Sequence, residues 1–280
     1  MPASMQDIQK HIESVTITKQ IAQAMKLVAT TKIRRAQDAV KYCRPYAQES
    51  KTLMQSVVDA QDTFRGRLFD PAPDGITLFI MVGSDGGLCG PYNINVCKTA
   101  HELIRQEENA AVLTIGTKPY EYFIRRGVTI QKSYRGISQN PFYMDGATIG
   151  EYVLDLYFSG VVSKVFIGYN YFQSMLSHIP TIFPLLPLAR SQEFNPAVAA
   201  GSFDEDFLES LLPDYVQTCI FHAMVEGAAC EQSARITSMD SAVKNCSDMM
   251  DRLQMQFNQV RQSAITQELS EIVSGAEALQ

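Results

Sequence analysis

The feature that most constrains the fold is the last quarter of the chain, whose composition is that of one very long helix. No proline follows Pro213 in this 280-residue sequence, and the only glycines there are Gly227 and Gly275. A helix of about 65 residues, rising about 1.5 Å per residue, would reach on the order of 100 Å. A compact domain has no use for such a length, so we expect this helix to pack against another long helix or to enter a partner protein.

Apolar residues in this segment recur at steps of three and four, as on one face of a helix. The main stripe consists of Ile236, Met239, Val243, Cys246, Met250, Leu253, Phe257, Val260 and Ala264. After Ala264 it shifts by one position to Ile265, Leu269, Ile272, Ala276 and Leu279. This shift predicts a paired stretch through Ala264 and a tip with a rotated apolar face. Upstream, a stripe of mostly small residues predicts a close approach of two helix axes: Val216, Ile220, Ala223, Gly227, Cys230 and Ala234.

The amino-terminal segment, from about Ala3 to Asp62, is a second long helix by the same criterion. Its apolar stripe begins at Ile8, Ile12 and Val15, continues at Ile21, Ala24 and Val28, and then steps strictly through Ile33, Ala36, Val40, Cys43, Ala47, Ser50, Met54 and Val57. Pro45 lacks a backbone donor, so we expect a kink or a break in supercoiling there. The two terminal helices are expected to form a left-handed antiparallel pair.

The middle of the chain has a different pattern, in which short apolar runs alternate with helical ones. We expect strands at 76–82, 111–115, 128–133 and 164–172, helices at 92–106, 119–126 and 145–159, and an extended edge at 179–188. The prolines at 180, 184 and 187 suit only an edge strand. This alternation predicts an α/β layered domain with a largely parallel sheet.

The predicted fold is therefore α/β: a long antiparallel coiled coil of the amino- and carboxy-terminal helices, with a Rossmann-like α/β domain inserted between them. We place the domains at 1–62, 75–190 and 207–280, with a linker from Arg190 to Asp206 that contains Pro196 and Gly201. The two helices meet although roughly 145 residues separate them along the chain.

The apolar fraction of the sequence is that of an ordinary globular protein. No run approaches the 18 or so apolar residues of a membrane span, and Asp7 and Glu13 argue against a targeting peptide. The six cysteines show no CxxC pair, so we expect reduced thiols in a cytosolic protein.

Charge is distributed unevenly along the chain. Six basic residues lie between Lys26 and Arg44 against one acid, Asp38. No aromatic residue interleaves with this cluster before Tyr42, which disfavours nucleic acid as the partner. A solvated helix face and docking onto an acidic protein surface both remain open.

A glycine-rich loop, Gly83-Ser84-Asp85-Gly86-Gly87-Leu88-Cys89-Gly90, follows the first strand where a phosphate-binding loop would lie. Pro91 and Tyr92 occupy the positions where a P-loop needs Lys and Ser or Thr, and the glycine spacing does not fit a dinucleotide site. We therefore interpret the loop as a tight strand-to-helix turn. No histidine lies close to Asp85 or Cys89 in the sequence, so neither residue has the general base that a nucleophile motif would provide. The four histidines are scattered along the chain, at His11, His101, His178 and His222. We expect no catalytic residue, no cofactor and no metal.

Four blocks of the sequence resemble the gamma subunit of F-type ATP synthases, the central rotor shaft. The match covers the whole length in order, and the last block is the most specific. The blocks are Ile17–Ala29 with Lys32–Gln37; Ser84-Asp85 with Gly87-Leu88-Cys89-Gly90 and Asn93; Pro180–Ile182 with Leu185–Leu188; and Glu231–Met239 with Arg261–Ala276.

The resemblance implies a non-catalytic rotor subunit that couples ion-driven rotation of the c-ring to ATP synthesis or hydrolysis in a hexamer of alpha and beta subunits. The helix pair would enter the hexamer, and the α/β domain would lie near the epsilon subunit and the c-ring. The chain would then be peripheral, at the cytoplasmic face of a bacterial plasma membrane.

The resemblance also assigns contact residues. Arg261, Gln262, Thr266 and Glu268 would contact catch loops of alpha or beta, with Met25 nearby, and Lys32, Arg34 and Arg35 would face acidic lever segments of beta. The residues of the loop at the base of the stalk would be Ser84, Asp85, Gly87, Cys89 and Gly90.

Two positions depart from the family pattern. Gly86 stands where a basic residue is usual, and Pro91 where a glycine is usual, so the contacts of this loop are expected to differ. The long dithiol insertion of the chloroplast type is absent, so the resemblance does not imply thiol regulation. The coupling ion is not encoded in this chain. A stand-alone coiled-coil scaffold and a nucleotide-dependent α/β enzyme are the alternatives.

Overall fold

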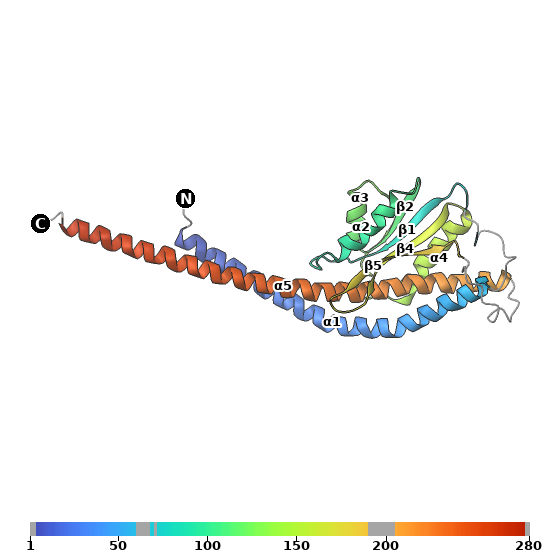
Figure 1. The fold of residues 1–280 in the computed structure, drawn as a ribbon, viewed down its shortest axis with the longest axis horizontal. Coiled ribbons are helices and arrows are strands. Elements are labelled where there is room, and N and C mark those ends of the chain that lie inside the picture. The colour runs from blue at the N-terminus through green and yellow to red at the C-terminus, as the bar shows by residue number, and fades with distance from the viewer. Residues whose placement is uncertain (1–3, 60–67, 70–71, 190–204, 278–280) are drawn as a thin grey trace. The chain divides into compact units, whose positions relative to one another are not determined.

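The computed structural model describes residues 4–59, 68–69, 72–189 and 205–277. Its elements in chain order are α1 (Met5–Asp59), β1 (Ile76–Val82), α2 (Tyr92–Ile104), β2 (Ala110–Ile115), α3 (Thr117–Ile124), β3 (Thr129–Tyr134), α4 (Tyr143–Ser159), β4 (Val162–Phe172), β5 (His178–Leu186) and α5 (Glu205–Glu277) (Figure 1). Two compact units result, one made of 1–28 with 236–280 and the other of 29–235, and α1 and α5 contribute to both. Most of the predicted linker lies outside the described residues, and the proposed domain limits stay a prediction.

The larger unit, 29–235, contains a five-stranded sheet in the order β3-β2-β1-β4-β5. The first four strands are parallel, and β5 pairs antiparallel with β4 at the edge. The prediction of a largely parallel sheet with a proline-containing edge is confirmed. Pro180 and Pro184 are tolerated in β5 because an edge strand needs ladder donors on one side only.

Both faces of this sheet are covered, because alternate side chains of a strand point to opposite faces. Phe79 and Met81 of β1 pack with the cluster formed by α2 and α3. Leu78 and Ile80 pack with α4, α5 and the end of α1 on the opposite face, as Figure 1 shows. Strands covered on both faces read as continuous apolar runs, which explains why β1 could be located from sequence.

Within this unit, α5 is buried around its whole circumference from Tyr215 to Arg235 with few exceptions. The stripe of small residues, predicted to allow a close approach of two helix axes, packs in part against the sheet. Ile220 packs in the core beneath the sheet, and a Cβ at Gly227 would lie 3.0 Å from Val82 Cγ1. The residues that meet Val40 of α1 belong to another face of α5: Phe221, Val225 and Ala229.

The α1 stripe from Ile33 to Val57 is confirmed, since each of its members is buried or half-buried. The helix runs through Pro45 without a break. Pro45 and Lys41 are both exposed, so the Lys41 carbonyl, which lacks its helical partner, is open to water.

The smaller unit, 1–28 with 236–280, is an antiparallel helix pair. Thr16 lies against Met250, and Lys26 forms an ion pair with Asp240. The seam consists of Ile8, Val15 and Leu253, with half-buried residues packed beside them: Ile12, Cys246, Met250, Phe257 and Val260.

Two details of the predicted register were wrong in this unit. Ile21, Ala24 and Val28 are exposed, and Ala22, seven positions after Val15, occupies the seam instead. Ala264 is also exposed, so the buried contact ends at Val260. The reason is the length of the partner, since α1 begins at Met5 and Ile8 is its first buried residue.

Candidate functional sites

The glycine-rich loop joins β1 to α2 at the carboxyl edge of the sheet. Gly83 donates its amide to the Ile115 carbonyl at 2.9 Å, and a Cβ at Gly83 would collide with Pro119. Gly90 has a φ of +56° and Leu88 a φ of +61°. The Leu88 side chain is 59% exposed. Packing of this side chain within the chain therefore does not explain why a bulky residue adopts the left-handed backbone conformation here.

Ser84, Cys89 and Asn93 hold the loop in shape. The Asn93 side chain accepts the Ser84 amide at 2.9 Å and donates to Ser84 Oγ at 2.7 Å and to Cys89 Sγ at 3.3 Å. Ser84 Oγ in turn donates to the Gly86 carbonyl at 2.6 Å. Burial raises the pKa of the Cys89 thiol, which is the opposite of what a nucleophile needs.

Asp85 connects this loop with the segments that follow β2 and β3. Its Oδ1 accepts the amide and hydroxyl of Thr117 at 3.1 and 2.9 Å. Its Oδ2 accepts the hydroxyl and amide of Ser138 at 2.8 and 3.2 Å. Burial alone would raise the pKa of Asp85, but hydrogen bonds from Gly136, Ser138 and Thr117 outweigh it and lower the pKa. The carboxylate is thus used inside the chain as an ionised acceptor.

Arg235 joins the loop to α5, and the sequence analysis gave it no role. Its Nη2 donates to the Gly87 carbonyl at 3.2 Å and to Glu231 Oε1 at 2.8 Å. A Cβ at Gly86 would lie 3.3 Å from the same Nη2. Gly86 therefore leaves room for Arg235, and a basic side chain in its place would bring a like charge beside the guanidinium. Tyr92 adds a second link by donating to the Gly227 carbonyl at 3.0 Å.

A buried ion pair, also missed from sequence, connects α1, α5 and β4. Arg44 Nε and Nη2 donate to the two oxygens of Glu226 at 2.8 and 3.0 Å, and the Phe172 amide donates to Glu226 Oε2 at 2.8 Å. His222 Nε2 lies 3.2 Å from Glu226 Oε1. The Glu226 side chain is fully buried. A carboxylate in so apolar a stretch of helix requires a cation, which is the signal that could have located the pair.

The basic run lies in the larger unit. Lys32 donates to Gln139 Oε1 at 2.7 Å and is half-buried, whereas Arg34 and Arg35 are exposed. Met25 lies in the smaller unit and is half-buried.

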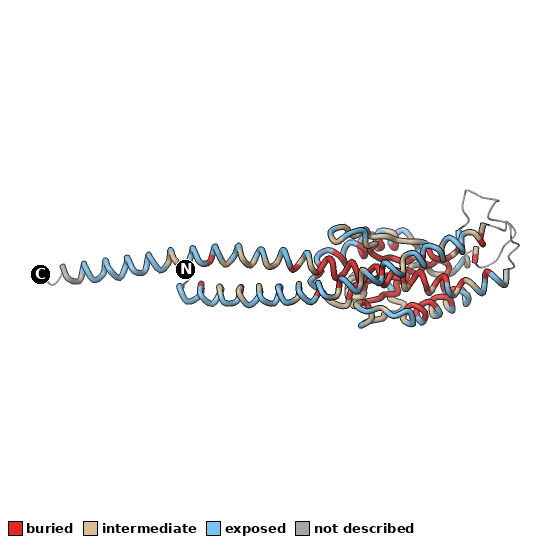
Figure 2. Tube along the Cα trace, turned by 90° about the horizontal axis from the view of Figure 1, so that it is seen from below, coloured by how far each residue is buried: buried red, intermediate tan, exposed pale blue. Residues whose placement is uncertain are grey.

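The carboxy-terminal part of α5 has no partner helix among the described residues. Every residue from Arg261 to Ser274 is exposed, including Gln262, Thr266 and Glu268 (Figure 2). The predicted tip stripe is exposed as well, with Leu269 at 58% and Ile272 at 67%. Thr266 donates to the Gln262 carbonyl within the helix, and the partner contacts predicted for this row stay a prediction.

The described part of the chain contains no cluster of His, Cys, Asp and Glu that could hold a metal ion. None of its helices is long and apolar enough to cross a membrane.

Comparison with known proteins gives a consistent result over the full length. The family model described as "ATP synthase" matches residues 4–279. The "ATP synthase gamma chain" of Alkaliphilus metalliredigens is 35% identical, covering all of both chains, and that of Geotalea uraniireducens is 37% identical, covering 99% of both. The "ATP synthase gamma chain, sodium ion specific" of Acetobacterium woodii is 34% identical over all of both chains.

Among solved structures, the chain is similar in fold to a chain of the Euglena gracilis mitochondrial ATP synthase OSCP/F1/c-ring assembly. The TM-score is 0.73 at 17% identity, covering 98% of this chain and 94% of that one. A chain of the rotor of the same enzyme gives a TM-score of 0.69 at 16% identity, covering 93% and 98%.

Proposed function

Because the chain belongs to the family of ATP synthase gamma chains, the central-stalk subunits of F-type ATP synthases, we propose that its two units have different tasks. The helix pair with its single-helix tip enters a hexamer of alpha and beta subunits. The α/β domain meets the epsilon subunit and the c-ring at the base. The chain itself carries no catalytic residue, and it is peripheral at the cytoplasmic face of a bacterial membrane.

The observation that carries this proposal is the exposed tip. From Arg261 to Ser274 the helix shows both a polar row and an apolar stripe to solvent, among them Ile265 and Leu269. A helix with exposed apolar residues needs a partner surface. A ring of subunits around a single helix supplies an apolar sleeve, and Arg261, Gln262, Thr266 and Glu268 then contact catch loops of alpha or beta.

The basic run supplies a second contact. Arg34 and Arg35 are exposed, and Lys32 is held by a neutral partner, Gln139. Three cations within one helical turn create a positive surface that suits acidic lever segments of beta. Met25 lies before this run, near the catch.

At the base, Leu88 supports a contact with a stalk partner. The surrounding hydrogen bonds of Ser84, Asp85 and Asn93 maintain its positive φ, and its side chain is exposed. Backbone strain held by such a network is typical of functional contacts. The loop made of Ser84, Asp85, Gly87, Cys89 and Gly90 would therefore present Leu88 to the epsilon subunit or the c-ring.

A shaft must transmit torque from its base to its helices, and the buried polar links of the larger unit serve this purpose. Arg235 bonds the loop to α5, Tyr92 bonds α2 to α5, and Glu226 bonds α5 to both α1 and β4. Directional bonds resist sliding of the domain along the helix better than apolar contacts, which have no preferred direction.

The experiment that tests the proposal removes the polar row. Arg261→Ala with Gln262→Ala should lower ATP synthesis and ATP-driven ion pumping in the assembled complex. Assembly should stay intact, because both side chains are exposed. Gln259→Ala is the matched control, since it changes an exposed polar residue outside the row. Normal coupled turnover in the double variant would contradict the catch assignment.

A further inference from the structure

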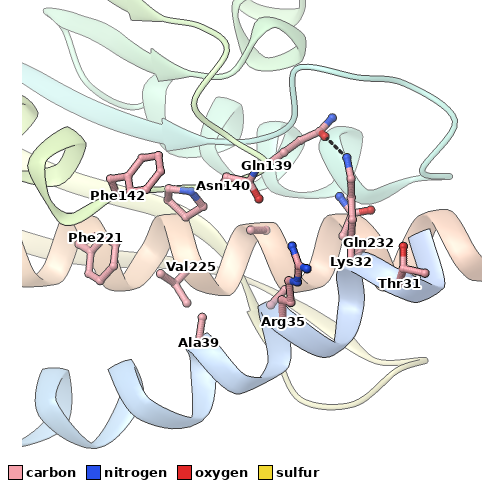
Figure 3. Close-up of a pocket in the computed structure, with 13 residues that line it drawn as sticks. Thr31, Lys32, Arg35, Ala39, Gln139, Asn140, Phe142, Phe221, Val225 and Gln232 are labelled. Atoms are coloured by element: carbon pink, nitrogen blue, oxygen red, sulfur yellow. Dashed lines mark hydrogen bonds between the residues drawn. The ribbon is translucent and has the colours of Figure 1, made fainter. Parts of the chain in front are cut away.

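A pocket of about 440 Å³ lies in the larger unit between α1, α5 and the segment that leads into α4 (Figure 3). Its volume falls within the range of about 300–1,000 Å³ that is typical of small-molecule sites. The lining residues that matter here are Lys32, Arg35, Phe142, Phe221, Val225 and Gln232. The proposed shaft contacts use Lys32 and Arg35 at one end of this pocket, but neither they nor the family resemblance assign a small-molecule ligand to it.

One end of the pocket presents hydrogen-bond donors. Lys32 and Arg35 extend from α1, and Gln232 extends from α5 beside Lys32 (Figure 3). No Asp or Glu is among the residues that line the pocket. Glu231, the neighbour of Gln232 in sequence, is paired with Arg235 at 2.8 Å. The donor end is therefore positive and suits an anionic group.

Gln232 supplies an independent sign that a ligand is missing. Its residue is only 2% exposed, and its Nε2 has no hydrogen-bond partner among the described residues. Its Oε1 accepts from Arg235 Nη1 at 3.3 Å. Because a guanidinium only donates, this bond determines which way the amide is oriented. An unpaired buried donor is costly, and an acceptor in the pocket would satisfy it.

The other end of the pocket is apolar. Phe142 and Phe221 lie there, and Val225 of α5 lies between the two ends (Figure 3). Phe142 is 70% exposed, so its ring is available to cover a bound molecule. Aromatic rings pack well against flat apolar bodies.

We propose that this pocket binds a small organic anion, in which a flat apolar body lies against Phe142 and Phe221 and a carboxylate meets Lys32, Arg35 and Gln232. The proposal does not depend on the shaft function, because every group it uses lies in the larger unit and is present in the chain alone.

The test measures binding of 6-fluoro-2-naphthoate to the full-length chain by ¹⁹F NMR line broadening. The neutral 6-fluoro-2-naphthamide, which has nearly the same shape, is the control ligand. We expect the carboxylate to bind about tenfold tighter than the amide, as one charge-assisted contact would give. Equal affinity of the two ligands, or no binding of either, would overturn the proposal.

Variants locate the binding. Arg35→Gln should weaken naphthoate binding about tenfold. Lys41→Gln, which removes an exposed cation of α1 outside the pocket, should leave it within about twofold. Ala39→Phe fills the pocket from an exposed position and should abolish binding, with an unchanged circular dichroism spectrum confirming the fold. Equal losses in the Arg35 and Lys41 variants, or retained binding in the Ala39 variant, would place the ligand elsewhere and refute the pocket.

Discussion

The buried ion pair of Arg44 and Glu226 allows the sharpest prediction about stability. Arg44→Met keeps the length of the side chain but removes both hydrogen bonds to Glu226, whose side chain is fully buried. Breaking a buried pair from one side costs about 3–5 kcal/mol, because it leaves an uncompensated charge. Two features favour the lower end: Arg44 is 27% exposed, and Glu226 keeps the Phe172 amide. We expect a loss of about 3 kcal/mol.

The assay follows the Phe172 amide, because that amide donates directly to Glu226. In the full-length chain, hydrogen exchange of the peptide containing Phe172 should accelerate on the order of 100-fold in Arg44→Met. Arg34→Met is the matched control, since it removes an exposed arginine of the same helix and should change exchange little. The same exchange rate in Arg44→Met and in the unmodified chain would refute the reasoning.

A double variant separates the charge from the packing. Arg44→Met with Glu226→Leu replaces both partners by apolar groups, which is often nearly neutral. Its unfolding free energy in urea should therefore be higher than that of Arg44→Met alone. Exchange at Phe172 cannot serve as the readout here, because Glu226→Leu also removes the acceptor of that amide. If the double variant were the worse of the two, burial of an unpaired charge would not be the cause.

The pair also predicts a pH dependence. Burial alone would raise the pKa of Glu226, but the neighbouring His222 ring, the Phe172 amide and Arg44 outweigh it and hold the pKa below its usual value of 4.5. A carboxyl group whose pKa is lowered on folding stabilises the fold above its unfolded pKa. That contribution is lost as the pH falls through the lowered value. The difference in unfolding free energy between the unmodified chain and Arg44→Met should thus shrink below pH 4.5.

Three further substitutions test the register and the loop. Val243→Asp places a charge in the half-buried seam of the helix pair and should cost about 2 kcal/mol in urea unfolding, whereas Lys244→Asp, on an exposed position, should change less than about 0.5 kcal/mol. Equal effects would contradict the register. Gly86→Lys should destabilise the chain by about 1 kcal/mol, measured as a lower thermal midpoint, since it sets a cation beside Arg235. An unchanged midpoint would show that the space is not needed. Leu88→Gly should stabilise the chain by about 1 kcal/mol by removing the positive-φ penalty while weakening its retention in the complex; full retention would count against the contact at the base.

Local patterns were sufficient for the elements of the fold. β1 was predicted at its observed bounds, Ile76–Val82. A seven-residue apolar run between turn residues, in a chain where helices and strands alternate, indicates a buried strand. The edge position of β5 followed from its prolines, whose missing donors exclude a central strand. The length of α5 followed from the absence of breakers after Pro213.

The sequence did not predict correctly which face of each long helix is buried. On α1, the predicted stripe continued from Val15 to Ile21, Ala24 and Val28, whereas Ala22, seven positions after Val15, lies on a different face from Ile21. The structure buries Ala22 and exposes Ile21 at 56%, so the spacing of apolar residues alone did not identify the buried face. On α5, the sheet and α1 bury opposite faces, so the stripe of small residues gave no indication of which partner it would meet.

The sequence by itself therefore determined the helices, the strands, their order and the family, since these depend on residues close together in the chain or on ordered motifs. Only the tertiary structure decided the pairing of Arg44 with Glu226, the link from Arg235 to the signature loop and the unpaired amide of Gln232. The physical reason is distance along the chain. A buried charge or amide needs a partner, but the sequence does not state which of many remote residues the fold will bring within hydrogen-bond reach.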